Sequence, residues 1–302
     1  MNEVQGWLNI YKPSGPTSFA VIKKIRQKFK LDKIGHGGTL DPLAEGVLPI
    51  AIGKATKLIP FINSNIKEYE FQIKWGEQTD TDDSDGKIIN VSKNIPLKKD
   101  IIYNLKLFEG EILQKPPKAS AIKINGKRAY KLLREGKNFE LSQKKVFVYS
   151  AELLDLAAKN SSRIKIKCGK GFYIRSFARD IAESLDTKGH INYLKRTKVG
   201  RFIDKNANLL DDLLKIRQTL HEFKGFHTSV SMLDGILAYE IDDEKNRLSI
   251  SQGKSINIDI KKLIKPPLNL TDRKIVFLTD KGKIISFGKL NGDLFKPDKV
   301  LI

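Results

Sequence analysis

The sequence predicts an α+β fold that ends in a separate small β-barrel domain. The stretch "EYEFQIKW", residues 68–75, alternates apolar and polar side chains, which is typical of a half-buried strand. Residues 163–185 change from this alternation to helical spacing within one continuous segment. Beyond about residue 235, short strands and turns recur roughly every 8 to 12 residues, as they do in small β-barrels.

The N-terminal segment predicts a strand followed by a helix. "GWLNIYK", residues 6–12, reads as a strand, and "PSGP" predicts a turn after it. Ser18 is then placed to cap a helix whose apolar residues recur at helical spacing, namely Phe19, Ile22, Ile25 and Phe29.

The middle of the chain predicts a strand and a hairpin. One face of the strand at residues 68–75 carries Tyr69, Phe71, Ile73 and Trp75. "TDTDDSDG", residues 79–86, predicts an acidic turn into "KIINV", which suggests a hairpin. A calcium-binding EF-hand is excluded, because counting from Thr81 puts Ser92 at the twelfth position, where glutamate belongs.

Residues 163–185 predict a strand, which includes Ile164, Ile166 and Cys168, followed by a helix. Arg175 therefore stands at a strand-to-helix junction, where α/β proteins often place functional groups, although a surface arginine is an equal alternative. Cys168 is most simply a core residue. The basic segment 115–139 is broken by Pro-Pro and Asn-Gly and predicts an exposed arm, which either grips a phosphate backbone or is a solvated excursion.

Composition favours a globular protein with a polyanionic partner. The chain has 302 residues and 40% hydrophobic content, enough for a large domain and a small one. Its 55 Lys and Arg against 35 Asp and Glu give a formal charge of +20, which makes nucleic acid the first candidate partner. The chain is also rich in Lys, Ile and Asn, so part of this charge reflects compositional bias.

Several classes of protein are excluded. No apolar run approaches the roughly 18 residues of a membrane span, and the N-terminus lacks the basic and apolar regions of a signal peptide, which predicts a cytoplasmic protein. The single Cys168 excludes an internal disulfide and a multi-cysteine zinc cluster. The four histidines show no metal-ligand spacing, so we expect no structural metal.

The stretch "GHGGTLDPLAEG", residues 35–46, places Asp41 in a glycine-bracketed segment. It is not a dinucleotide fingerprint, because Leu40 stands where the third glycine is needed. It does not continue into a P-loop either, because Lys54 is followed by alanine and Leu48 stands where the first glycine is needed. A tight turn in which Asp41 caps the next backbone segment remains an alternative to a catalytic role.

Five motifs in this order resemble the TruB family of tRNA pseudouridine-55 synthases: "GHGGTLDPLAEGVLPIAIGKATK", "KEYEF", "GEQTDTDDSDG", "CGKGFYIR" and "YLKRTKVG". "YKPSGPTS" is similar to the family's N-terminal lysine-proline motif, and residues 115–139 to its RNA-gripping thumb. The resemblance implies the pseudouridine synthase fold, a mixed, mainly antiparallel central sheet flanked by helices. It implies a catalytic domain at residues 1–235 and a PUA-like RNA-binding domain at residues 238–302.

The resemblance implies that uridine 55 of tRNA is isomerised to pseudouridine. Breaking N1–C1′ and forming C5–C1′ involves no net redox change and no external group, so no cofactor is expected. Asp41 matches the family's essential aspartate, which acts as nucleophile, and Arg175 matches the arginine paired with it. Whether Asp41 attacks C6 or C1′, or assists a glycal route, stays open.

The remaining site residues also follow from the resemblance. Tyr69 matches the residue that stacks on the flipped uracil, and it is a candidate for the base that takes the proton. His36 matches the side chain that enters the RNA beside the vacated position. Tyr173 and Leu194 match residues lining the same pocket, and Lys12 is the N-terminal contributor to local packing or charge.

The expected partner is the T arm of tRNA, bound by a monomer without guide RNA. One alternative is a non-catalytic tRNA-binding or folding factor that retains this fold; the presence of Asp41, Tyr69 and Arg175 together argues against it. Another is the eukaryotic and archaeal relative that works with guide RNAs. The thumb-like insertion and the short C-terminal domain favour the stand-alone bacterial type.

Overall fold

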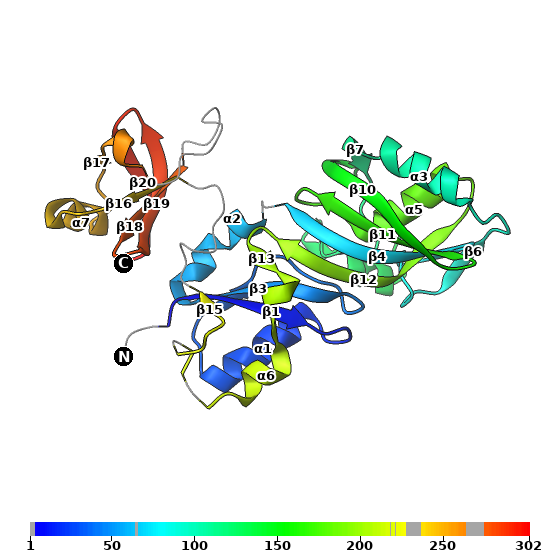
Figure 1. Cartoon of the computed structure of the whole chain (residues 1–302), viewed down its shortest axis with the longest axis horizontal. Helices are drawn as coiled ribbons and strands as arrows, with labels where there is room; N and C mark the ends of the chain where they lie inside the picture. Colours follow the sequence, from blue (N-terminus) through cyan, green and yellow to red (C-terminus); the bar gives the residue numbers. More distant parts are fainter. Residues whose placement is uncertain (1–3, 64–65, 218, 221, 228–236, 264–274) are drawn as a thin grey trace.

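The computed structural model describes residues 4–63, 66–217, 219–220, 222–227, 237–263 and 275–302. Most of them build one large sheet with its helices, and the C-terminal residues build a smaller sheet (Figure 1). The described strands of the large sheet follow the order β14-β1-β3-β12-β4-β11-β10-β7, in which β1 and β14, and β3 and β12, run parallel. The neighbouring pairs are otherwise antiparallel, so the predicted mixed, mainly antiparallel sheet is confirmed.

The large sheet contains β1 Gly6–Lys12, β2 Ile34–His36, β3 Glu45–Ile52, β4 Lys67–Trp75, β7 Gly110–Gln114, β10 Lys144–Ala158, β11 Ser161–Cys168, β12 Gly189–Val199, β13 Phe202–Ile203, β14 Asn208–Leu209 and β15 Phe226–His227. Its helices are α1 Ser18–Phe29, α2 Ile59–Asn63, α3 Lys98–Leu107, α5 Ile174–Ser184 and α6 Leu210–Lys215, with short 3-10 segments η1 Gly53–Leu58 and η2 Asp204–Asn206. The predicted hairpin is confirmed as β5 Glu77–Thr79 paired with β6 Ile88–Val91.

Both faces of the sheet centre are buried, which explains why β1 and β3 are apolar almost throughout. One face packs Leu8, Ile50 and Phe71 against α1, α3, α5 and α6. The other face packs Trp7 and Val47 against η1, α2 and the C-terminal sheet. Strand β4 alternates between buried and half-buried residues along its whole length, which confirms the predicted half-buried strand.

The C-terminal sheet follows the order β16-β18-β19-β20-β17 and fits the predicted PUA-like domain. Its strands are β16 Leu237–Glu240, β17 Ile256–Asn257, β18 Ile275–Asp280, β19 Lys283–Asn291 and β20 Leu294–Val300, with the 3-10 segment η3 Ile260–Lys262. It contacts the rest of the chain at α2, where Phe61 meets Phe277 and Phe287 nearly edge-on at ring-centre distances of 4.9 and 5.1 Å. The predicted end of the catalytic domain at residue 235 lies outside the described residues.

Three details of the predicted elements are wrong. The cap of α1 is Thr17, whose hydroxyl accepts the Ala20 amide at 3.0 Å, while Ser18 is buried and bonds elsewhere. Phe19 is 73% exposed, because the buried stripe of α1 runs through Ser18, Val21, Ile22 and Ile25. In the C-terminal domain, part of the stretch predicted as short strands is the helix α7 Glu244–Ser251. Asp243 caps it by accepting the Asn246 amide at 2.7 Å.

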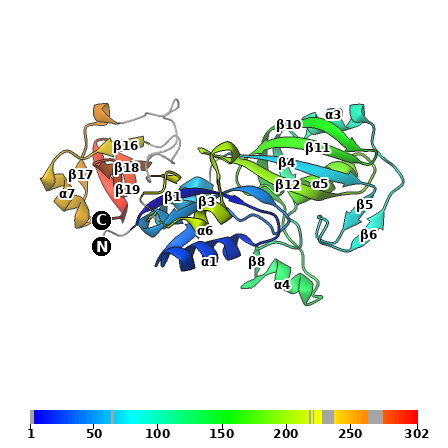
Figure 2. The ribbon, with the colours of Figure 1, turned by 60° about the horizontal axis from the view of Figure 1, so that its bottom comes forward.

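The basic segment 115–139 projects from the large sheet as an arm (Figure 2). It contains the small hairpin β8 Lys123–Ile124 and β9 Lys127–Arg128, and the short helix α4 Ala129–Arg134. None of the described helices is long and apolar enough to cross a membrane.

Candidate active site

Asp41 lies in the loop of residues 37–44, between β2 and β3. Its carbonyl accepts the Ala44 amide at 3.1 Å, which closes a β-turn with Pro42 at the second position, where the fixed φ of proline fits. The Asp41 carboxylate instead pairs with Arg175, at 3.0 Å between Oδ2 and Nη2. Its side chain is 37% exposed, so the carboxylate is both paired and open to a ligand.

Hydrogen bonds hold the 37–44 loop from several sides. The Ser18 hydroxyl accepts the Leu40 amide at 2.9 Å and donates to the Leu40 carbonyl at 3.0 Å. The Gly15 amide donates to the Pro42 carbonyl at 2.8 Å, and the Ser14 hydroxyl donates to the Leu43 carbonyl at 3.0 Å. The backbone on both sides of Asp41 is therefore fixed by the N-terminal segment.

Lys12, at the end of β1, lies fully buried beneath this loop. Its ammonium donates to the carbonyls of Pro13 and Pro16 at 2.8 Å each and of Pro42 at 3.3 Å. Burial lowers the Lys12 pKa to about 8, although the carboxylates of Asp41 and Glu45 act in the opposite direction. Lys12 thus supplies hydrogen bonds and a positive charge next to the Asp41 loop.

Arg175 lies in the first turn of α5 and its side chain is 6% exposed, so the surface-arginine alternative is wrong. Its guanidinium contacts Asp83 at 3.3 Å in addition to Asp41. It also donates to the carbonyls of Thr81 and Ala119, each at 3.1 Å. One buried cation therefore joins Asp41 to the acidic hairpin and to the base of the basic arm.

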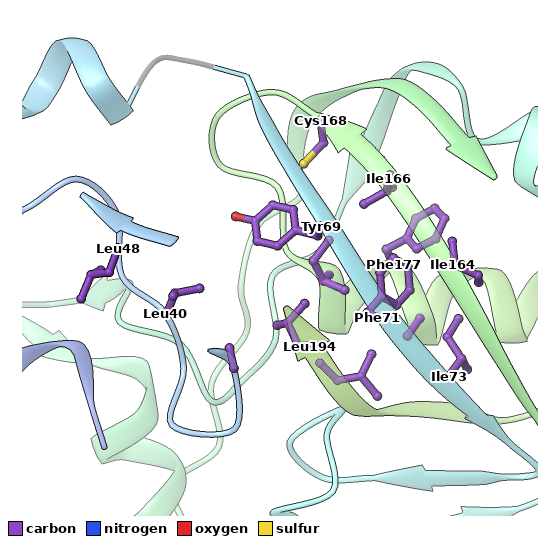
Figure 3. Close-up of a cluster of buried hydrophobic side chains, with 14 of the residues drawn as sticks. Leu40, Leu48, Tyr69, Phe71, Ile73, Ile164, Ile166, Cys168, Phe177 and Leu194 are labelled. Atoms are coloured by element: carbon purple, nitrogen blue, oxygen red, sulfur yellow. The ribbon is translucent and has the colours of Figure 1, made fainter. Parts of the chain in front are cut away.

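Tyr69 and Leu194 contribute apolar surface beside the loop. They lie on the adjacent strands β4 and β12, and both are buried in the same hydrophobic cluster as Leu40. The phenol oxygen of Tyr69 points away from Cys168, toward the segment that carries Leu40 (Figure 3). Burial raises the Tyr69 pKa to about 12, so the phenol is protonated at neutral pH.

Tyr173 immediately precedes α5, with Gln114 of β7 fixing its backbone. The Tyr173 amide donates to Gln114 Oε1 at 2.8 Å, and Gln114 Nε2 donates to the Tyr173 carbonyl at 3.1 Å. Burial raises the pKa of its phenol, the nearby Arg175 charge lowers it, and the Asp41 charge raises it. The structure thus brings Tyr173 to the same site.

His36 ends β2 at the other end of the loop. Burial and the nearby Arg196 charge lower the imidazole pKa, so the ring is neutral at pH 7. Its Nδ1 is buried and has no hydrogen-bond partner among the described residues. Among the described residues no hydrogen bond or ion pair joins His36 to Asp41; the two are linked through the loop itself.

Three residues of the site were missed by sequence reasoning. They are Ser18, which fixes Leu40; Asp83, which shares Arg175; and Arg196, which donates to the carbonyls of Gly38 and Val47. "YLKRTKVG" and "TDTDDSDG" contain Arg196 and Asp83, but local pattern does not distinguish a buried charge from the exposed charges beside it. The sequence predicts Ser18 as a helix cap, because a small hydroxyl side chain can serve either as a helix cap or as an anchor for a loop.

The site can supply one accessible carboxylate, oriented by a buried arginine, beside an aromatic ring and an apolar wall. Such a carboxylate can act as a nucleophile or transfer a proton. No group of His, Cys, Asp or Glu within the described ranges is arranged to hold a metal ion.

Comparison with known proteins adds to this geometry. Residues 26–174 match the family described as TruB family pseudouridylate synthase (N terminal domain). A protein named tRNA pseudouridine synthase B from Bartonella tribocorum is 36% identical to this chain. The match covers 98% of this chain and 96% of that protein. The chain belongs to the TruB family. It is therefore an RNA-modifying isomerase, a pseudouridine synthase.

Other TruB relatives agree over most of the chain. Proteins of the same name from Rickettsia bellii and Caulobacter vibrioides are 37% and 39% identical, covering 97% and 84% of this chain and 97% and 81% of their own length. Among solved structures, a "Cbf5-Nop10-Gar1 Complex" matches with a TM-score of 0.75 at 24% identity, over 98% of this chain and 85% of the other. An archaeal box H/ACA Nop10-Cbf5 complex matches with a TM-score of 0.72 at 22% identity, over 98% and 86%. Both solved structures therefore share the fold of this chain through its C-terminal domain.

Proposed function

We propose that the protein converts uridine 55 in the T loop of tRNA to pseudouridine, with Asp41 as the nucleophile. The observation that carries this proposal is the ion pair between the exposed Asp41 carboxylate and the buried Arg175, next to Tyr69 and Leu194. The relatives named tRNA pseudouridine synthase B support tRNA as the substrate class.

The isomerisation exchanges a C–N bond for a C–C bond at the same ribose carbon. Asp41 supports it because a carboxylate can form and break a bond to the nucleoside without an external reagent. Arg175 keeps this carboxylate oriented, since its guanidinium holds Oδ2 of Asp41 at 3.0 Å. Tyr69 and Leu194 provide the apolar and aromatic surface against which the detached uracil is held and turned.

The target uridine is stacked inside the folded T loop, so it must be flipped out to reach Asp41, at a cost of about a few kcal/mol. We propose that the His36 side chain fills the space that the flipped uridine leaves in the RNA. Its neutral imidazole avoids the cost of burying a charge among the nucleobases. The arm at residues 115–139 and the +20 charge of the chain hold the T arm through phosphates and shape.

The protein acts on its own rather than with a guide RNA. The solved neighbours are complexes with further proteins, and at 24% identity or less they share the fold of this chain. The basic arm and the short C-terminal domain of this chain provide RNA-binding surface within a single polypeptide. A factor that only binds tRNA would not need an exposed carboxylate paired with a buried arginine.

The test is to incubate purified protein with an unmodified tRNA transcript, without guide RNA or added metal, and to map pseudouridine by position. We expect product at position 55 alone. Asp41→Asn, which is nearly isosteric, should abolish turnover while tRNA affinity stays within about tenfold. Absence of product with the wild-type protein, or turnover above a few per cent with Asp41→Asn, would contradict the proposal.

A further inference from the structure

Arg196 occupies the point where the two halves of the large sheet meet. It lies on β12 and pairs with Gly46 of β3 on one side and with Tyr69 of β4 on the other. The approach to β3 is so close that a Cβ atom on Gly46, whose φ is +102°, would lie 2.3 Å from the Arg196 carbonyl oxygen. The backbone of Arg196 is therefore locked between the strand that follows the Asp41 loop and the strand that carries Tyr69.

The side chain of Arg196 is a buried cation without a carboxylate partner. The residue is 1% exposed, and in the described part of the chain no carboxylate forms an ion pair with it. Its Nε donates to the Val47 carbonyl at 2.8 Å and its Nη2 to the Gly38 carbonyl at 3.0 Å. Arg196 is also the cross-strand partner of Tyr69, and its charge lowers the pKa of the Tyr69 phenol.

Burying a charge without a counter-ion is costly, so a fold that needed only volume at this position would gain by using an apolar residue. What the guanidinium supplies is a rigid planar fork with several donors, which a lysine cannot reproduce. Here the fork spans two segments: the Asp41 loop at Gly38 and β3 at Val47.

We propose that Arg196 is a positioning residue of the reaction, which bonds the Gly38 carbonyl from the strand next to Tyr69 and so holds the Asp41 loop in place against Tyr69. Gly38 lies three residues before Asp41, so this link sets the distance between the carboxylate and the aromatic ring. The inference rests on the proposed function, because Tyr69 and Asp41 are assigned there to the reacting uridine.

Arg196 also acts on the phenol electrostatically. Burial raises the Tyr69 pKa, whereas the Arg196 charge lowers it. The other ionisable groups that influence Tyr69 are Cys168 of β11 and Asp41, and both raise its pKa. Arg196 is therefore the group that opposes the effect of burial on the Tyr69 pKa.

The first test is kinetic. Arg196→Lys keeps the charge but loses the fork, and we expect the single-turnover rate to fall about 100-fold, the scale of a displacement of roughly 1 Å, while tRNA affinity changes less than about threefold. In a Tyr69→Phe background the same substitution should cost less than about tenfold, because the phenol on which the Arg196 charge acts is already absent. Lys198→Gln, on the same strand with a 44% exposed side chain, is the matched control and should leave the rate unchanged.

The second test does not depend on pseudouridine formation. All eight tyrosines are labelled with 3-fluorotyrosine. The Tyr69 resonance is the fluorine signal that is absent in Tyr69→Phe. Arg196→Gln should move the Tyr69 ionisation to higher pH, because the cation that lowers its pKa is removed. Lys198→Gln should not move it.

Equal losses from Arg196→Lys in the wild-type and Tyr69→Phe backgrounds, or an unchanged Tyr69 ionisation in Arg196→Gln, would overturn the role of Arg196. So would a loss explained entirely by weaker tRNA binding. If Arg196→Lys does not fold, the fluorine titration of Arg196→Gln decides, and a failure of both to fold would mark Arg196 as a residue of the core alone. A wild-type protein that makes no pseudouridine would contradict the proposed function, while the fluorine titration still decides whether Arg196 and Tyr69 are coupled.

Discussion

The hydroxyl of Ser18 and the backbone of Leu40 exchange two hydrogen bonds, one in each direction, at 2.9 and 3.0 Å. All of these atoms are buried, so no water replaces the hydroxyl if it is removed. Leu40 directly precedes Asp41, and α1 thereby fixes the start of the turn that carries Asp41.

Ser18→Ala should lower both stability and activity. It leaves a buried amide and a buried carbonyl unpaired, which costs about 1–3 kcal/mol of unfolding free energy. Because the loop next to Asp41 loosens, we expect the single-turnover rate to fall about tenfold or more. Thr17→Ala is the control: it removes the cap of α1 at a cost of about 1 kcal/mol but does not touch the loop, so its rate should match wild type. Equal rates for the two variants would contradict the prediction.

Arg175→Lys should lose most activity although the positive charge is kept. A lysine ammonium cannot reach Asp41, Asp83 and the carbonyls of Thr81 and Ala119 at once, so the carboxylate loses its fixed orientation. We expect a single-turnover rate about 100-fold lower, with tRNA affinity nearly unchanged. Arg179→Lys on the same helix is the matched control, since Arg179 pairs with Asp82 and Asp180 and not with Asp41. Arg175→Lys within threefold of wild type would disprove the positioning role.

Activity should fall as the pH rises through about 8, the pKa to which burial lowers Lys12. Protonated Lys12 has three N–H donors for its three carbonyls, whereas the neutral amine has two and loses its charge beside Asp41 and Glu45. Single-turnover rates between pH 6.5 and 9.5 measure this fall in activity. Lys12→Met should be slow at every pH, and its rate should not fall as the pH rises through about 8. A fall that persists in Lys12→Met would assign the titration to another group.

Deprotonation of Lys12 should affect stability in the opposite direction to activity: the unfolding free energy should rise as the pH rises. The pKa of Lys12 is 10.5 in the unfolded chain and about 8 in the folded one, so between these values unfolding takes up a proton. The contribution of Lys12 to the unfolding free energy therefore increases as the pH rises from about 8 to 10.5. Urea unfolding of wild type and Lys12→Met isolates the contribution of Lys12. The difference in unfolding free energy between the two proteins should change between about pH 8 and pH 10.5. A difference that is constant across the window would contradict the assignment.

Phe61→Ala should loosen the C-terminal domain without altering the active site. Phe61 fills the contact between α2 and the rings of Phe277 and Phe287, and its loss should cost about 1–3 kcal/mol. We expect tRNA binding to weaken while the rate at saturating tRNA stays within about twofold. Phe19→Ala, which removes a ring that is 73% exposed, is the control and should change neither quantity. A loss of rate at saturation would show that the domain contact supports the chemistry directly.

Local pattern was sufficient for elements in which one face is buried and the other is not. β4 alternates as "KEYEFQIKW" predicts, and α5 begins where the apolar spacing after Cys168 changes, because side-chain periodicity follows directly from backbone geometry. The pattern failed at α7, where the polar stretch around Asp243 forms a helix through its cap and the burial of Ile250. It also failed at Phe19, where tertiary packing selected a neighbouring stripe of α1.

By itself, the sequence determined the mixed architecture, the glycine-rich turn that presents Asp41, and the set of motif residues from Lys12 to Leu194. Only the tertiary structure decided which charges are buried together. Arg175 and Arg196 look like the other basic residues of a chain with 55 of them, but one is shared between Asp41 and Asp83 and the other has no carboxylate partner among the described residues. The physical reason is that the cost of burying a charge depends on which donors and acceptors surround it, and here they come from segments up to 158 residues apart along the chain.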